Sequence, residues 1–245
     1  MKKQTSKFSL VEILVVVAII GILSSLLLPA LGQARKKSKL ALCTSNIRQI
    51  STALFMYTSD QDQYLPYSHN LNNGNSSWDD KLGVYDYDGR GLDESAFQKE
   101  SSNGSSIYGC PATEVELQNQ SRSLRSYSLN YGKEGNSNGK FRGFMNSNSW
   151  SMKITNINNT GRTIMITENH RPGNYVSVGN NGHTNNNFIK DQYSNMTFWA
   201  HDYAKLNFGT ISGSSNFMSL QHTYLGLRDA SANGNQKGTM WDCQN

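Results

Sequence analysis

FSLVEILVVVAIIGILSSLLLPAL, residues 8–31, is an almost unbroken apolar segment near the start of a chain of 245 residues. At about 1.5 Å of rise per helical residue, it spans roughly the 30 Å of a bilayer's hydrocarbon core. We therefore expect a transmembrane helix over residues 8–31. An acid, Glu12, interrupts the segment close to its start. An ionised carboxylate at that depth costs about 2.5 kcal/mol or more, so it needs a partner or a function.

Basic residues flank this segment on both sides. Residues 1–7 form a short leader that contains Lys2, Lys3 and Lys7 and no acid, which favours a cytoplasmic N-terminus. Basic residues between positions 35 and 39 follow the segment and compete with this signal. A cleaved secretory signal is the alternative, but its apolar region would be shorter and a small-x-small cleavage site would follow it.

An amphipathic continuation of the helix is predicted for residues 32–60. Pro29 precedes it and lacks an N–H donor, so we expect a kink or a loosening of the helix near Ser25. Beyond this point apolar side chains recur every three or four residues, which places them on one face of a helix and predicts a surface against which a domain packs. This apolar stripe consists of Leu40, Cys43, Ile47, Ile50, Leu54 and Tyr57.

Residues 7–12, Lys-Phe-Ser-Leu-Val-Glu, and the apolar helix after them resemble the N-terminus of the type IV pilin and type II secretion pseudopilin family. Gly21 and Pro29 stand where the family has helix-loosening residues. In that family a membrane peptidase removes the basic leader just before the Phe, and the new N-terminus is methylated. The resemblance implies that Phe8 begins the mature chain. It also implies that Glu12 pairs with the terminal ammonium of a neighbouring subunit during filament assembly.

The pairing implied for Glu12 agrees with the cost of burying charge. A carboxylate and an ammonium each lose hydration when buried, and only the pair offsets that cost, so a misplaced subunit leaves both groups unpaired. Position 7 departs from the family, which normally has Gly where this chain has Lys7. A small residue lets the peptidase approach the backbone closely, so cleavage before Phe8 is left open. An uncleaved anchor is the alternative.

The resemblance continues into a branch of the family with a large outer domain, through residues 29–37, 43–50 and 56–66. Members of that branch often end in a His-containing hairpin with Asp-Gly at its turn. The corresponding segment here runs from His201 to Leu220 and has Ser212 in place of the Asp, so we carry over the hairpin and no chemistry.

Three cysteines leave one thiol over if a disulfide forms. An exported domain permits disulfides. Cys43 and Cys110 stand in segments that look like the cysteine positions of the branch, and the resemblance therefore implies that these two are joined. A bond between Cys110 and Cys243 is the alternative.

Strand patterns occupy much of residues 61–245. Together with residues 8–60 they predict an α+β fold, in which an antiparallel sheet packs on the C-terminal half of a long N-terminal helix. A further short helix is expected at Trp78–Val84. The expected strands are Arg125–Tyr131, Thr163–Thr167, residues 198–201 and a hairpin over 205–222.

An acidic run after the short helix invites a calcium-loop interpretation. Asp86, Asp88 and Asp93 supply the hard oxygen ligands that Ca²⁺ prefers. The spacing fails the EF-hand pattern, which requires Glu where Phe97 stands. A solvated loop is the preferred interpretation, with calcium as the alternative.

No catalytic or metal-binding motif is recognisable along the chain. Histidines do stand beside acids, at His170 next to Glu168 and His201 next to Asp202, and His183 lies in a Gly-Asn loop. However, the chain has no His-Glu-x-x-His, no Gly-x-Ser-x-Gly, no phosphate loop and no Cys-x-x-Cys. We therefore expect no enzyme activity, no metal site and no cofactor.

Composition bounds the function further. Only 36% of the residues are hydrophobic, and many of these lie in the apolar segment, so the remainder is rich in Asn, Ser, Gly and Tyr. Such a composition is typical of a loop-rich domain outside the cell. The net charge of +5 could suggest nucleic acid. The basic residues concentrate in the leader and just after the apolar segment, where topology and lipid headgroups account for them, so nucleic-acid binding is not expected.

The sequence therefore predicts a pilin-like subunit of a type II secretion or type IV pilus-type filament. We expect a single pass through the bacterial inner membrane, with residues 61–245 on the periplasmic or outer side. Its expected partners are other pilin-like subunits, prepilin peptidase and membrane lipid. Two alternatives remain: a monomeric, membrane-tethered module that binds polysaccharide, and a tethered hydrolase.

Overall fold

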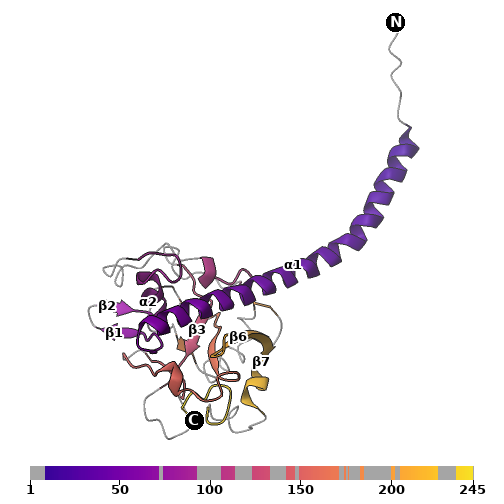
Figure 1. The fold of residues 1–245 in the computed structure, drawn as a ribbon. Helices are drawn as coiled ribbons and strands as arrows, with labels where there is room; N and C mark the ends of the chain where they lie inside the picture. Colours follow the sequence, from indigo (N-terminus) through magenta and orange to yellow (C-terminus); the bar gives the residue numbers. More distant parts are fainter. Residues whose placement is uncertain are drawn as a thin grey trace. The chain divides into compact units, whose positions relative to one another are not determined.

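A computed structural model describes residues 9–71, 74–92, 106–113, 123–132, 142–146, 149–170, 174, 176, 183–184, 200–201, 205–225 and 236–244. The chain divides into two compact units, Met1–Lys39 and Leu40–Asn245, and the second is called the head below. Helix α1, Leu10–Asp60, continues from the first unit into the second (Figure 1).

Helix α1 joins the two helical segments that the sequence predicts. Its N-terminal part is long and apolar enough to cross a membrane, by length and composition. Every residue from Leu10 to Ser38 is exposed. The helix ends at Asp60, where the amphipathic pattern also ends. The domain limits 1–7, 8–31, 32–60 and 61–245 stay predictions.

The apolar stripe of α1 is buried in the head from Cys43 onward, while Leu40 is half-buried. Cys43, Ile47, Ile50 and Leu54 are fully inaccessible to solvent, and Tyr57 is 5% exposed. They form one hydrophobic cluster with Tyr127, Leu129 and Ile166 of the sheet. The period of three and four residues therefore places these side chains on the face that packs.

A five-stranded sheet in the order β5-β3-β4-β6-β7 covers this stripe. The four strands from β3 to β7 in that order are antiparallel neighbours, which confirms the predicted α+β, pilin-like class. The short strand β5 pairs with β3 in parallel, so the sheet is not antiparallel throughout. The strands are β3 Tyr127–Asn130, β4 Ile164–Glu168, β5 His183–Thr184, β6 Lys205–Thr210 and β7 Ser215–Ser219.

Several elements differ from the prediction in detail. Helix α2, Trp78–Val84, has the expected bounds, and Asp80 accepts the backbone N–H of Ser77 at its start, 2.7 Å away. The expected strand over 198–201 is wrong for residues 200–201, which form a bend, and the rest of it lies outside the described residues. The remaining short elements are β1 His69–Leu71, β2 Gly74–Ser76 and the 3-10 turns η2 Ser106–Tyr108, η3 Ile154–Asn156 and η5 Leu220–Tyr224.

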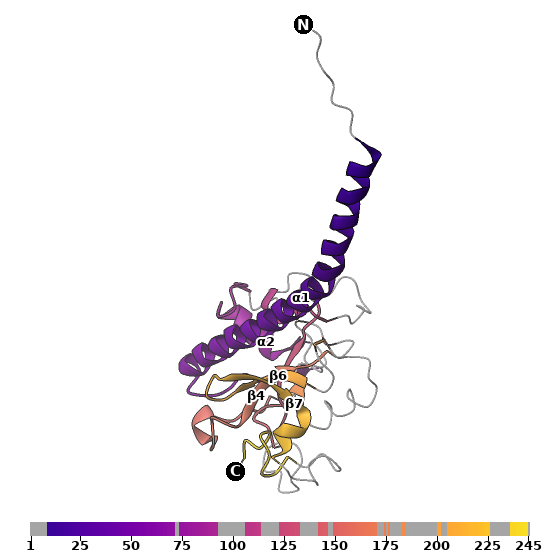
Figure 2. The same cartoon turned by 90° about the vertical axis from the view of Figure 1, so that its right-hand side faces the viewer.

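The C-terminal segment covers the opposite face of the sheet (Figure 2). Leu206 and Phe208 of β6 pack there with Trp241, whose ring meets that of Phe208 edge to face at 6.0 Å. Trp241 also donates from its ring N–H to Thr223, 2.9 Å away. Because side chains alternate along a strand, the intervening Asn207 and Gly209 face α1.

Gly209 lets the helix approach the sheet. A Cβ placed there would lie 2.6 Å from a methyl carbon of Ile166 and 2.9 Å from one of Ile47. Both distances are shorter than van der Waals contact, and both neighbours belong to the packed core. A side chain at this position therefore has to push α1 and β4 apart.

We predict that Gly209→Ala lowers the free energy of unfolding by about 1–3 kcal/mol, because it overpacks the contact between helix and sheet. Gly161→Ala is the matched control, since a Cβ at Gly161 meets no atom within 4 Å. Urea unfolding of the full chain in detergent, followed by tryptophan fluorescence, measures both. Equal losses of unfolding free energy in Gly209→Ala and Gly161→Ala would refute the close approach of α1 to the sheet at Gly209.

Candidate functional site

Glu12 lies in the first turn of α1, where its Oε2 accepts the backbone N–H of Ser9 at 2.7 Å. Ser9-Leu-Val-Glu12 has the spacing of a capping box, in which an acid at the third helical position binds the cap residue's N–H. The helix N-terminus also carries partial positive charge that favours a carboxylate. The acid thus has a partner in its own chain, which the sequence analysis missed although the Ser-x-x-Glu signal was present. Lys7 and Phe8 lie outside the described residues.

Gly21 and Pro29 lie within an unbroken helix. Pro29 cannot donate to the carbonyl of Ser25, one turn earlier. The hydroxyl of Ser25 donates to the carbonyl of Ile22 at 2.7 Å. A Cβ at Gly21 would meet no atom within 4 Å. Both positions are therefore open on their outer face, and a loosening of the helix here stays a prediction.

A disulfide joins Cys43 of α1 to Cys110, which follows η2. The bond links residues 67 positions apart, and closing a loop of that length in the unfolded chain corresponds to about 4 kcal/mol of stabilisation. Cys243, the alternative partner, is a buried free thiol. The head is thus tied covalently to the helix at the first buried residue of the stripe.

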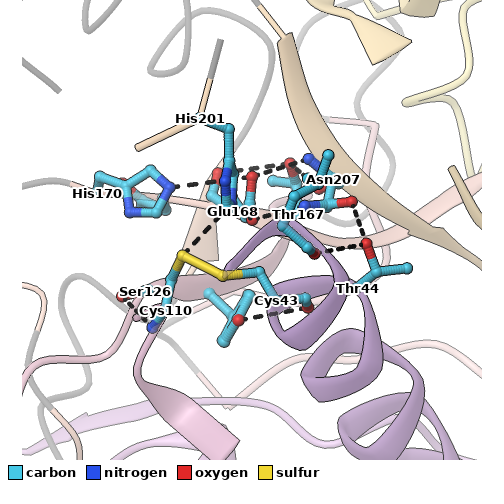
Figure 3. Close-up of polar contacts among 12 residues, drawn as sticks. Cys43, Thr44, Cys110, Ser126, Thr167, Glu168, His170, His201 and Asn207 are labelled. Atoms are coloured by element: carbon cyan, nitrogen blue, oxygen red, sulfur yellow. Dashed lines mark hydrogen bonds and ion pairs between the residues drawn. A yellow bond between two sulfur atoms is a disulfide. The ribbon is translucent and has the colours of Figure 1, made fainter. Parts of the chain in front are cut away.

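Glu168, at the end of β4, lies fully buried beside this disulfide (Figure 3). The backbone N–H of Asn207 donates to its Oε2 at 2.8 Å, and the side-chain amide of Asn207 donates to its Oε1 at 2.8 Å. Nε2 of His201 lies 3.0 Å from Oε1 and 3.4 Å from the sulfur of Cys110. The carboxylate therefore connects β6, His201 and the disulfide.

This cluster also holds the helix. The hydroxyl of Thr44, next to Cys43 on α1, donates to the side-chain carbonyl of Asn207 at 2.8 Å. Asn207 in turn fixes Glu168. Two adjacent residues of α1 are thus held in the head: Cys43 by a covalent bond to the segment after η2, and Thr44 by hydrogen bonds that lead to β6 and β4.

The pKa of Glu168 reflects these neighbours. Burial alone raises the pKa of a carboxyl group, but the interactions with His170 and His201 outweigh it and lower the value to about 2. Nε2 of His170 lies 3.9 Å from Oε2, an ion-pair distance rather than a hydrogen bond. The carboxylate therefore stays ionised in the folded protein at neutral pH.

In the sequence, His170 near Glu168 and His201 next to Asp202 belong to no catalytic or metal-binding motif. The structure brings His201 to Glu168 instead, across 33 residues of sequence. The side chains of Glu168 and His201 are 0% and 4% exposed, so the pair is closed to a substrate. Asp202 lies outside the described residues, and no side-chain contact is described for His183.

Asp86 and Asp88, in the acidic run after α2, bind other residues of the protein. Asp88 has a fully buried side chain and binds Arg90 at 2.7 Å and the hydroxyl of Tyr108 at 2.5 Å. The preferred interpretation as a solvated loop is therefore wrong for Asp88, because a neighbouring Arg neutralises and covers it. Asp86 accepts the backbone N–H of Gly91 at 2.8 Å. Asp93 lies outside the described residues, so the calcium alternative is untested.

We predict that Glu168→Gln removes part of the acid sensitivity of the head. The folded-state pKa of about 2 lies below the ordinary 4.5, so the ionised form stabilises the fold above about pH 4.5. That stability is lost as the pH falls toward 2, and it amounts to about 3 kcal/mol. Urea unfolding of the full chain in detergent, repeated from neutral to acid pH, measures it. Asp62→Asn, at an exposed carboxylate, is the control, and equal pH slopes for Glu168→Gln and wild type would contradict the prediction.

Comparison with known proteins finds a relationship in the N-terminal quarter of the chain. Over 63 residues, 38% are identical to the type II secretion system core protein G of Pseudomonas aeruginosa, and the same identity and length hold for that of Aeromonas hydrophila. Each match covers 26% of this chain and 44% of the relative. No family model and no solved structure matches the chain. The N-terminal quarter of this chain is homologous to type II secretion pseudopilins, and it leads into a pilin-like α+β fold.

Proposed function

We propose that this chain is a pilin-like subunit of a type II secretion or type IV pilus-type filament. The N-terminal helix anchors it in the bacterial inner membrane, and the head lies on the periplasmic or outer side. Prepilin peptidase removes residues 1–7, and the apolar helix then packs against copies of this chain or related subunits. The chain has no enzymatic role in this proposal.

The observation that carries the proposal is the exposed surface of α1. Its large apolar side chains from Leu10 to Leu31 are each at least half exposed, with Leu10 at 77%. Such a continuous apolar surface needs lipid or protein to cover it. The N-terminal quarter of the chain is homologous to the core protein G of two type II secretion systems. Lipid before assembly and neighbouring helices after it would supply the cover.

Glu12 has two candidate roles that differ in what they require. A helix cap requires a hydrogen-bond acceptor, and the 2.7 Å bond from Ser9 uses one carboxylate oxygen. A pair with the ammonium of a neighbouring Phe8 requires negative charge, because only an ion pair offsets the desolvation of both groups. Gln serves at this position of a capping box but carries no charge. The two roles can therefore be separated.

We predict that Glu12→Gln is inserted in the membrane like wild type but enters filaments at least tenfold less, because an unpaired buried ammonium costs about 3 kcal/mol or more. Incorporation is measured by co-expressing tagged variant and wild-type subunits and quantifying both in sheared filaments. Ser9→Ala is the matched control, since it removes the cap side chain and leaves the charge. If Glu12→Gln enters filaments like wild type, the pairing with a neighbouring ammonium is excluded and Glu12 acts only as a helix cap.

A second candidate function, glycan binding by the head, is favoured by an aromatic hollow at the end of α1. The hollow has a volume of about 540 Å³. Polar groups that suit sugar hydroxyls, among them Gln61, Asp62 and Ser151, interrupt its apolar walls. Its aromatic side chains are Tyr57, Tyr64, Tyr67, Tyr85 and Trp150.

The backbone around this hollow is strained. Asp62, Gln63 and Ser149 have φ angles of 48°, 68° and 63°, in the left-handed region that non-glycine residues rarely adopt. Two of them, Asp62 and Ser149, line the hollow. Such conformations persist where the surrounding structure enforces them, and they cluster at ligand sites. Tyr64 and Tyr85 are 44% and 47% exposed, so part of the aromatic surface of the hollow is open to solvent.

We predict that the head binds neutral oligosaccharides and that Trp150→Ala weakens binding about fivefold to tenfold, the effect of losing one stacked ring. Titration calorimetry with cellohexaose and with chitohexaose measures this. Met56→Ala, on the exposed side of α1 outside the hollow, is the control. Binding of neither sugar, or equal loss in both variants, would exclude this function and leave the filament proposal standing.

A further inference from the structure

Four potential metal ligands converge beside the start of the buried stripe. The sulfurs of Cys43 and Cys110, a carboxylate oxygen of Glu168 and a ring nitrogen of His201 all lie within 4.8 Å of one another. They come from α1, the segment after η2, the end of β4 and the residue pair 200–201 (Figure 3). Three of the four residues are buried, and the side chain of the fourth, His201, is 4% exposed.

The donor set suits one class of metal. Two sulfurs, one imidazole nitrogen and one carboxylate oxygen form the tetrahedral ligand set typical of Zn²⁺, whereas Ca²⁺ and Mg²⁺ prefer oxygen ligands. Tetrahedral ligands at about 2.3 Å from zinc lie roughly 3.8 Å apart. This separation is shorter than the 4.8 Å within which all four ligand atoms of the cluster lie. The Cα atoms of Cys43 and Cys110 are 5.3 Å apart, so rotation of the side chains separates the sulfurs without moving the two segments.

The neighbours of these ligands form the outer layer that a metal site requires. Asn207 binds both oxygens of Glu168 and fixes the carboxylate. His170 is 1% exposed, and neither of its ring nitrogens has a hydrogen-bond partner among the described residues. A buried polar group in that state calls for an explanation such as an ion nearby. With two thiolates, a carboxylate and Zn²⁺ the site carries one negative charge, and Nε2 of His170 lies 3.9 Å from Oε2 of Glu168.

We infer that Cys43, Cys110, Glu168 and His201 form a zinc site whenever the disulfide is reduced. A dithiol supplies two electrons and two protons, the bond between the sulfurs breaks, and the dithiol becomes a disulfide. Zn²⁺ then binds both sulfurs as thiolates, and their two protons pass to solvent. Oxidation reverses these steps and releases the metal. Either state links α1 to the segment after η2 at the same point, and the inference does not depend on the proposed function.

Cobalt(II) is the probe, because a tetrahedral thiolate site gives it intense visible bands and thiolate charge-transfer bands. The full chain in detergent, carrying Cys243→Ser, is reduced with a phosphine, freed of the phosphine without oxygen and titrated with Co²⁺ and then Zn²⁺. We expect one equivalent of Co²⁺ with both sets of bands, displaced by Zn²⁺, and no such bands for the oxidised chain. Glu168→Gln and His201→Ala should each weaken binding at least tenfold, and Cys43→Ser should abolish the charge-transfer bands of a two-thiolate site.

Several results would overturn the inference. One is a reduced chain that gives no more cobalt signal than Cys43→Ser. Another is a signal that neither Glu168→Gln nor His201→Ala changes, because the sulfurs would then bind cobalt without the other two ligands. If reduction unfolds the head, zinc should restore its near-ultraviolet circular dichroism in wild type and not in Glu168→Gln. A reduced head that stays unfolded at saturating zinc would also refute the site.

Discussion

The contact between the apolar stripe of α1 and the sheet is the constraint on which the rest of the structure depends. Gly209 allows the close approach, and Ile47 and Ile166 fill the space on either side of it. Between Ile13 and Leu28 the same helix carries no charged side chain and is apolar on nearly every side. One continuous helix thus has two kinds of surface, and its exposed apolar part needs lipid or protein to cover it.

A disulfide and a set of hydrogen bonds reinforce this contact where the buried stripe of α1 begins. The disulfide of Cys43 and the hydrogen bonds from Thr44 through Asn207 to Glu168 lie side by side. Buried ion pairs add little net stability as a rule, but removing one partner is costly because it leaves a charge unpaired. Glu168 therefore favours one position of the helix on the sheet. Glu12 is the opposite case, an exposed acid whose local partner is a backbone N–H.

Periodic patterns in the sequence predicted the helices and most of the long strands. They could not predict which polar residues from distant segments meet in the fold. Spacing along residues 40–57 predicted the face of α1 that packs, and the short helix expected at Trp78–Val84 has the bounds of α2. The Cys43–Cys110 pair came from family resemblance alone, since spacing left Cys243 open. The pairing of Glu168 with His201 could not be predicted, because the two residues are 33 positions apart and no local motif encodes their contact. For the same reason a metal site assembled from four separate segments has no sequence signature.

In the proposed filament, neighbouring copies cover the apolar helix and neutralise Glu12. The most direct test is zero-length carbodiimide crosslinking of filaments from the native host, assembled from isotopically light and heavy subunits and analysed by peptide mass spectrometry. The account predicts a crosslink that joins the terminal amine of Phe8 in a light copy to Glu12 in a heavy one. Chains that keep Lys7 and give no crosslink between light and heavy copies would contradict it.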